Sequence, residues 1–334
     1  MSFLQLHAQV KFVAGQQVGA LYDLQGGRIR SVPLVLGSLL DSFASLPLQE
    51  ILHQVFGGDE ALFRRYTDFL LREDWAFVTD RPECYPPASL AWESAYRLNT
   101  AIVAHAPDSP YSLAAALEEL SAAGCRHLEL QLRDYPTEDE REAVWRQIGN
   151  VLGKCEFRRG TLVQSGAQAA GSVSVTTVGQ RIRNWPRFGT VVLLGRAENR
   201  NLEHEGKRYH LRKAPTLAEY ARRTWQRNPQ THFVGPAYFR EARVANPYFN
   251  RRLAVTAEGR FKNDLLYGGA EDFGRVGARP IAEVIADPVF RERWFASPDK
   301  ITETKGDPMR YCLRYDRAIR RAATGGAEWS FSAA

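Results

Sequence analysis

The sequence predicts an α/β protein made of a small N-terminal domain, a larger unit with a parallel sheet, and a C-terminal segment. Within residues 1–80, three strand-like segments precede three helix-like ones, and further along the chain strands and helices alternate. Apolar residues make up 44% of the sequence, which is ordinary for a globular protein that buries a core. A chain of 334 residues is long enough for two or three such units.

The N-terminal strands are predicted by the alternation of apolar and polar residues. Side chains alternate over residues 6–12, a second strand is expected at 18–24, and a third at 28–32. Gly26 and Gly27, between the last two strands, supply the positive φ angles of a tight turn. The sequence therefore predicts an antiparallel arrangement at the start of the chain.

Three helices and a short strand are expected next. Apolar residues recur at helical spacing in residues 34–43, 47–56 and 60–72. Asp59 is placed to cap the third of these helices. Residues 75–78 then favour a wing strand.

Three strands followed by three helices form the pattern of a winged-helix domain. We place this domain at residues 1–80 and a proline-rich linker at residues 81–96. Residues 97–230 are predicted to form an α/β partial barrel, because strands and helices alternate there. The expected elements are strands at 97–104, 127–132, 160–164, 173–178 and 190–194, with helices at 111–123 and 139–152.

Composition and charge narrow the possible partners. No apolar run approaches the roughly 20 residues of a membrane-spanning helix, and the N-terminus lacks the features of a signal peptide. We therefore expect a cytoplasmic protein with no membrane partner. The net charge of +6, from 44 basic and 38 acidic residues, suits an acidic partner, which leaves both a peptide and a nucleic acid open.

The cysteine pattern excludes several metal sites. The chain has Cys84, Cys125, Cys155 and Cys312, and no two are close enough for a CxxC pair or a CxxxCxxC radical-SAM loop. The histidines are scattered and show no ligand motif, so no metal or cofactor is expected. We expect Cys125 to be buried, and the basic residues near Cys155 would lower the pKa of its thiol.

Short motifs in the N-terminal domain resemble a known family. Phe12-Val-Ala-Gly15, Leu21-Tyr-Asp-Leu-Gln25 and Val32-Pro33 are similar, in the same order, to motifs of the PqqD-like recognition element of RiPP systems. RiPPs are ribosomally synthesised and post-translationally modified peptides. In that family the leader region of the precursor peptide adds a strand to the third β-strand and packs on the third helix. The resemblance therefore implies leader-peptide binding by strand addition.

The resemblance also implies which residues contact the leader. They lie on the third strand and the third helix: Ile29, Arg30, Val32, Phe63, Tyr66 and Leu70. Two other interpretations stay open, namely a domain kept only for structure and a winged helix that binds DNA. Residues 60–72 are not especially basic, which argues against a DNA-recognition helix.

The C-terminal region carries a second, longer resemblance. Residues 231–320 resemble the SPASM domain of maturases in grasp-with-spasm peptide systems, and the helix-to-strand step at 120–130 is similar to radical-SAM half barrels. Residues 321–334 are expected to be a flexible tail. The matching residues are Asn246-Pro-Tyr-Phe-Asn-Arg251, Glu258-Gly259, Lys262-Asn263, Phe273-Gly-Arg-Val276, Ile281-Ala-Glu-Val284, Asp287 to Trp294, Asp299-Lys-Ile301, Arg310-Tyr311 and Arg317-Ala318.

The cysteines that hold clusters in that family are missing here. An iron–sulfur cluster needs several thiolates at one site, and only Cys312 lies near an expected position. The chain is thus interpreted as a pseudo-radical-SAM protein. Asp264, Asp307 and Asp316 would suit Mg²⁺ or Mn²⁺, but we expect them to be solvated loop residues. The expected cluster positions fall near Ala254, Asp264, Thr304, Asp307, Leu313 and Asp316.

The leading hypothesis is an accessory subunit without catalytic residues. It would bind the leader of a precursor peptide and present it to a separate modifying enzyme, such as an iron-dependent peptide oxidase, as a heterodimer. An ATP-grasp ligase is the other candidate partner. A fold that has lost its ligands can still act as a scaffold, although fold alone does not establish function.

Two alternatives of other classes remain. The chain could be a peptide-modifying enzyme with its own metal site that is not an iron–sulfur cluster, which metal analysis would detect. It could also bind nucleic acid through its basic stretch at residues 195–229, although we expect that stretch to be a solvated face and nucleic acid not to be a partner. The basic residues there are Lys207, Arg208, Arg212, Lys213, Arg222, Arg223 and Arg227.

Overall fold

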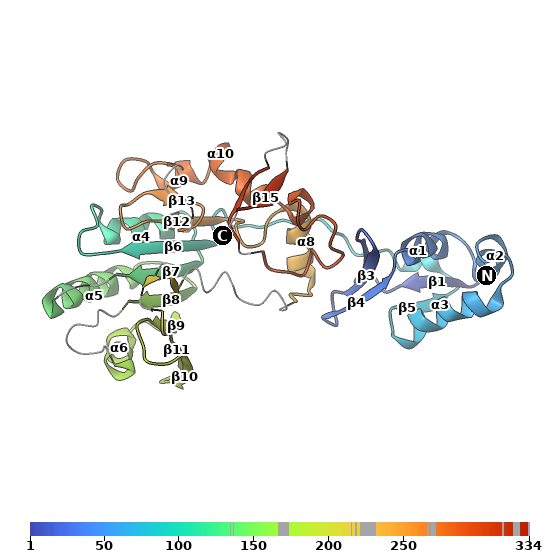
Figure 1. Ribbon diagram of the computed structural model, residues 1–334, viewed down its shortest axis with the longest axis horizontal. Coiled ribbons are helices and arrows are strands. Elements are labelled where there is room, and N and C mark those ends of the chain that lie inside the picture. Colours follow the sequence, from blue (N-terminus) through green and yellow to red (C-terminus); the bar gives the residue numbers. More distant parts are fainter. Residues whose placement is uncertain are drawn as a thin grey trace.

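Two main sheets of different kinds organise the molecule: a large sheet toward one end of its long axis, and a small sheet between α8 and the N-terminal helices (Figure 1). The computed structural model describes residues 1–133, 135, 137–165, 174–214, 216–217, 219–220, 232–265, 267, 272–315, 317–322 and 328–332, with only the backbone of residue 138. In this part of the chain, no helix is long and apolar enough to cross a membrane.

The N-terminal region contains a three-stranded antiparallel sheet, a separate two-stranded ladder and three helices. The sheet has the order β2-β3-β4, and β1 pairs with β5. The sequence did not predict β1 as a separate strand. The elements are β1 (Phe3–Leu6), β2 (Val10–Ala14), β3 (Val18–Asp23), β4 (Arg28–Pro33), α1 (Leu36–Ser45), α2 (Leu48–Gln54), α3 (Glu60–Arg72), β5 (Ala76–Thr79) and a 3-10 turn at Pro82–Cys84.

The predicted glycine turn and the predicted helix cap both occur in this region. Gly27 has a φ of +68° in the turn between β3 and β4, a value that favours glycine. The Asp59 side chain accepts a hydrogen bond from the Leu62 N–H at 3.0 Å, which caps α3.

The second sheet has eight strands in the order β10-β11-β9-β8-β7-β6-β12-β13. The six central strands are parallel, and the two outermost pairs are antiparallel. The chain is therefore a mixed α/β protein with a large, mostly parallel sheet. The elements up to β11 are β6 (Thr100–His105), α4 (Leu113–Ala122), β7 (His127–Leu132), α5 (Glu138–Leu152), β8 (Arg159–Gln164), α6 (Val175–Ile182), β9 (Phe188–Leu193), β10 (Arg200–His204) and β11 (Lys207–Leu211).

The C-terminal part completes this sheet and adds short elements around it. Residues 329–331, which the sequence placed in a tail, form a strand in which Trp329 is buried. The elements are α8 (Pro236–Val244), β12 (Arg252–Val255), β13 (Phe261–Lys262), α9 (Ile281–Val284), α10 (Pro288–Arg291), 3-10 turns at Glu292–Phe295 and Pro298–Lys300, β14 (Ile319–Arg321) and β15 (Trp329–Phe331).

One predicted element is wrong. Residues 173–178 were expected to be a strand, but α6 begins at Val175. The Ser174 side chain accepts a hydrogen bond from the Thr177 N–H at 2.9 Å and so caps a helix. Val178 and Ile182, four residues apart, are both buried, which is the helical period rather than the strand period.

The small sheet is covered on both faces, and each face belongs to a different core. Leu21 and Val32 pack with α1, α2 and α3. On the other face, Tyr22 packs with Phe239 of α8 and with Cys312. The Tyr22 hydroxyl also donates to the Pro308 carbonyl at 2.7 Å. The N-terminal sheet is therefore held against the C-terminal part of the chain.

Candidate functional site

The outer edge of β4 can be assigned from the hydrogen bonds of its neighbours. In an antiparallel pair, residues that bond to the adjacent strand alternate with residues that point away from it. The Gly15 N–H donates to the Val18 carbonyl at 2.9 Å, and the Leu24 N–H donates to the Gln9 carbonyl at 3.1 Å. The even-numbered residues of β3 therefore bond to β2, and its odd-numbered residues bond to β4.

The register then shows which groups of β4 point outward. The odd-numbered residues of β3 lie opposite Arg30 and Val32. Ile29 and Ser31 consequently direct their N–H and C=O groups away from the sheet, and no backbone partner for them occurs among the described residues. Pro33 ends this row of donors because it has no N–H. The edge of β4 is open to another strand.

One wall beside this edge is the end of α3. The Arg30 guanidinium lies 3.6 Å from the Glu73 carboxylate. Arg28 donates to the Glu73 carbonyl at 3.2 Å, and its guanidinium lies 5.1 Å from the centre of the Trp75 ring. These contacts join β4 to the end of α3.

A stripe of apolar residues follows the same flank of α3. Leu62, Tyr66 and Phe69 are spaced at helical intervals from Glu73, so they share its side of the helix. Leu62 is 40% exposed, and Tyr66 and Phe69 are half-buried. Tyr66 and Phe69 also pack against the core of the N-terminal region, and the Tyr66 ring lies 6.1 Å from the Phe56 ring, measured between centroids.

The opposite wall comes from the C-terminal part of the chain. Ile29 packs against the buried cluster that includes Tyr22 and Phe239 of α8, and Val234 and Tyr238 pack against the same cluster. Phe233 is 38% exposed and stacks on Tyr238, with ring centroids 5.2 Å apart. The Tyr238 hydroxyl donates to the Leu313 carbonyl at 2.8 Å, which fixes the ring.

The structure separates the predicted contact residues into two groups. Arg30 lies on β4 with an exposed side chain, whereas Tyr66 is half-buried and its ring lies 6.1 Å from the Phe56 ring, measured between centroids. Val32 and Leu70 are 4% and 0% exposed, so they shape the site only from within the core.

The two other predicted residues point elsewhere. Phe63 packs against Phe56, with ring centroids 5.6 Å apart, and Ile29 contributes its side chain to the α8 wall. Sequence reasoning missed Leu62 and Phe69, although their helical spacing from Tyr66 was a usable signal. It also missed the α8 wall, for which the sequence offers no local signal.

A buried polar cluster joins β7 to β12 in the large sheet. Arg252 bonds to the Asp264 carboxylate at 3.1 Å, and its guanidinium lies 3.9 Å from the Tyr248 ring centre. Gln131 donates to Glu129 at 2.7 Å. Burial raises the pKa of Glu129, although the Gln131 hydrogen bond and the Arg252 charge oppose that rise. We assign this network to holding strands together.

The expected cluster positions do not suit an iron–sulfur cluster. Asp264 is 2% exposed and is engaged by Arg252 and by the Tyr248 hydroxyl, so the prediction of a solvated loop residue is wrong for it. Thr304 donates to the Pro298 carbonyl at 2.7 Å. Asp307 accepts from the Met309 N–H at 2.7 Å. Asp316 lies outside the described residues.

The buried cysteines also do not suit an iron–sulfur cluster. Burial raises the pKa of Cys312 to about 11 and that of Cys125 to about 12, so neither thiol is poised to ionise. The suggestion of a lowered pKa for Cys155 is wrong, because burial raises it. Within the described ranges, no three His, Cys, Asp or Glu residues come together as a metal site.

Part of the basic stretch is not a solvated face. Lys207 is 8% exposed and donates to the carbonyls of Trp185 and Phe188, at 2.9 and 3.1 Å. The structure includes Arg208, Arg212 and Lys213 of this stretch, whereas residues 222, 223 and 227 lie outside the described ranges.

Comparison with known proteins gives no family for the chain. No protein-family model matches it, and no curated protein matches it in sequence. Among solved structures it is similar to the crystal structure of Streptococcus suis SuiB bound to S-adenosylmethionine. That similarity covers 93% of this chain and 94% of the other, at 6% identity and a TM-score of 0.31. A similarity at this level carries no argument about function.

Proposed function

We propose that this chain binds an extended peptide segment on the edge of β4, as the leader-recognition subunit of a RiPP modification system. The observation that carries the proposal is the open backbone edge at Ile29 and Ser31, on a strand whose Arg30 pairs with Glu73 at the end of α3. A strand added there would gain main-chain hydrogen bonds from β4 and side-chain contacts from two walls. The motif resemblance of residues 12–33 supports a leader peptide as the ligand.

The rest of the chain then serves as a platform in this proposal. The winged-helix assignment of residues 1–80 and the SPASM-like assignment of residues 231–320 belong to the proposal, as do the linker at 81–96 and the middle domain at 97–230. Among the described residues at the expected cluster positions, Asp264, Thr304 and Asp307 are already engaged in hydrogen bonds or ion pairs, which supports a separate enzyme for the chemistry. That partner would be an iron-dependent peptide oxidase or an ATP-grasp ligase.

Binding to labelled peptides tests the proposal directly. The probes are fluorescent synthetic peptides corresponding to each short open reading frame encoded beside the gene, titrated with the full chain and followed by anisotropy. Ser31→Pro removes an outward N–H without touching the bonds between β4 and β3, and proline is tolerated on edge strands. We expect it to weaken binding roughly tenfold, because one bond is lost and the ring obstructs strand addition.

Ser31→Ala is the matched control, since it keeps the N–H and removes only an exposed hydroxyl. It should bind like the unaltered chain. Circular dichroism would verify that both variants are folded. Equal binding by the proline and alanine variants, for a peptide that does bind, would show that β4 is not the site.

A further inference from the structure

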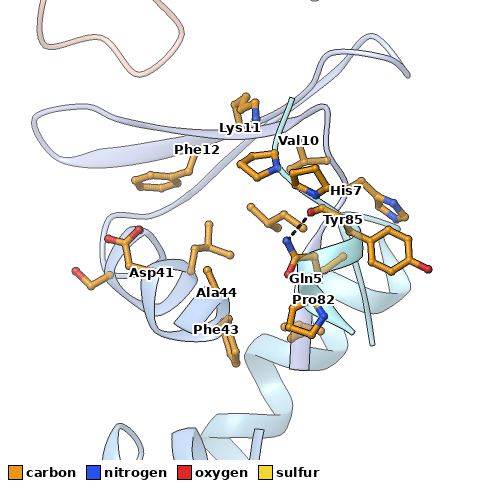
Figure 2. Close-up of a pocket in the computed structure, with 18 of the residues that line it drawn as sticks. Gln5, His7, Val10, Lys11, Phe12, Asp41, Phe43, Ala44, Pro82 and Tyr85 are labelled. Carbon is orange, nitrogen blue, oxygen red and sulfur yellow. Dashed lines mark hydrogen bonds between the residues drawn. The ribbon is translucent and has the colours of Figure 1, made fainter. Parts of the chain in front are cut away.

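A second open edge lies on the other side of the N-terminal sheet, along β2. Beside it, a groove of about 930 Å³ is bounded by β2, β1, α1 and the proline-rich residues 82–87. Figure 2 shows Phe12 and Val10 next to β2, Asp41 and Ala44 on α1, and Pro82 and Tyr85 on the remaining side. The Gln5 side chain donates to the Tyr85 carbonyl at 3.1 Å and ties the proline-rich segment to β1.

The backbone groups along this edge are open at its centre. Because the odd-numbered residues of β2 bond to β3, Val10, Phe12 and Ala14 direct their groups outward. Two hydrogen bonds mark the ends of the open part of this edge. The Val10 N–H donates to the His7 carbonyl at 2.8 Å, and Arg310 donates to the Ala14 carbonyl at 2.8 Å. Between them, no described residue bonds to the N–H or C=O of Phe12.

The groove side of β2 is apolar at its floor and acidic at its rim. Leu4, Leu40 and Phe43 line it and are buried. Asp41 on α1 and Glu83 in the proline-rich segment are exposed and also line it. An apolar side chain fits this floor, and the polar lining includes His7 and Lys11 as well as the two acidic residues.

The other side of β2 is basic. Figure 2 shows Lys11 on the side of the strand opposite Phe12. Lys11 faces Arg240 and Arg243 of α8, and its pKa is lowered by burial and by the charges of these two arginines. No acidic partner of these three cations occurs in the described part of the chain, and Glu241 between the arginines is held by Asn250 at 2.7 Å.

We propose that the β2 edge binds an extended segment of a partner protein in which apolar and acidic residues alternate. Successive side chains of an added strand point to opposite faces, so the apolar ones enter the groove and the acidic ones face Lys11, Arg240 and Arg243. Charge complementarity selects the acidic residues. A peptide on the outer edge of β4 would lie three strand spacings from β2, roughly 14 Å, and would leave this edge open. The inference therefore does not depend on the proposed function.

A designed peptide can test this edge. The probe is a fluorescent, end-blocked peptide of about seven alternating leucine and glutamate residues, titrated against the full chain by anisotropy at low and high salt. Ala44→Trp fills the groove from an exposed position and should weaken binding roughly tenfold. Arg243→Glu reverses one cation and should weaken it about two- to fivefold, with a smaller salt dependence.

Matched controls separate these effects from general damage. Ala143→Trp and Arg146→Glu change exposed residues of α5 in the same way and should leave binding unchanged. An alternating leucine and lysine peptide should bind at least about fivefold more weakly. The inference would be overturned if the lysine peptide bound equally well, if Ala44→Trp had no effect, or if Ser31→Pro rather than Ala44→Trp abolished binding.

Discussion

The eight-stranded sheet and the three-stranded sheet differ in where their unsatisfied backbone groups lie. In the large sheet, six parallel strands bond to one another, and the terminal strand β13 is two residues long, with the Phe261 N–H already donating to the Gly274 carbonyl. In the small sheet, both faces are covered by separate cores, but β4 and β2 each present outward groups. A covered face with an open edge favours strand addition. In our proposal, recognition lies in the small sheet and the large sheet has a supporting role, although the large sheet also ends on one side in a five-residue strand, β10.

The largest expected effect concerns the charge pair inside the large sheet. Asp264→Ala should lower the free energy of unfolding by about 3–5 kcal/mol, because it leaves the Arg252 charge buried without its partner. Urea denaturation would measure this. The control is Glu60→Ala, which removes an exposed partner of Arg64 and should cost less than about 0.5 kcal/mol. Equal effects would contradict the view that this sheet depends on a buried network.

A core substitution tests whether the small sheet opens on its own. Leu70→Ala removes a fully buried side chain and should cost about 2–5 kcal/mol. Hydrogen exchange should show lost protection in residues 1–80 while β6 to β9 stay protected. Leu71→Ala, at a neighbouring position that is 39% exposed, is the control and should change protection little. Simultaneous loss of protection in both sheets would show that they unfold as one unit.

A smaller change tests the contact between the two parts of the chain. Tyr22→Phe removes the hydroxyl that donates to the Pro308 carbonyl and should cost about 0.5–1.5 kcal/mol. Thermal unfolding would measure the loss, and hydrogen exchange should locate it in β3 and residues 306–312. An unchanged stability would mean that this hydrogen bond adds little to the ring packing on Phe239 and to the other contacts between the two parts, such as the bond from Arg310 to the Ala14 carbonyl.

The smallest expected effect is a dependence of stability on pH in the small sheet. Burial tends to raise the pKa of Asp23, but hydrogen bonds from Gly26 and Arg28 outweigh it and hold the pKa below the ordinary value of 3.8. The contribution to stability is therefore complete above that value and is lost as the pH falls through the lower pKa of the folded state. Because Arg28 is half-exposed, the effect should stay below about 1 kcal/mol.

Denaturation between pH 5 and 2, compared with Asp23→Asn, would measure that effect. The variant should show a flatter pH profile over the acidic part of the range, because asparagine does not titrate. Identical profiles for the two proteins would mean that the Asp23 carboxylate contributes no pH-dependent stability to the small sheet.

The sequence was a good guide where the signal was local. Apolar spacing and the cap at Asp59 placed α3, and Gly26 and Gly27 placed the turn before β4. It failed at residues 173–178, where valines suggested a strand although Ser174 could cap a helix. The prediction for Asp264 also failed. A carboxylate in a loop is expected to be solvated, and its ion pair with Arg252 is visible only in the structure.

For the candidate site, the sequence by itself, through a family resemblance, predicted a strand and a helix that would flank a peptide, and its alternation showed which residues share a face of that strand. Only the tertiary structure decided which backbone groups point outward, because that depends on the register of β3 with both of its neighbours. The tertiary structure also decided that α8 covers the back of the small sheet and sets Arg240 and Arg243 beside Lys11. Such contacts join residues more than two hundred positions apart, and no local pattern encodes them.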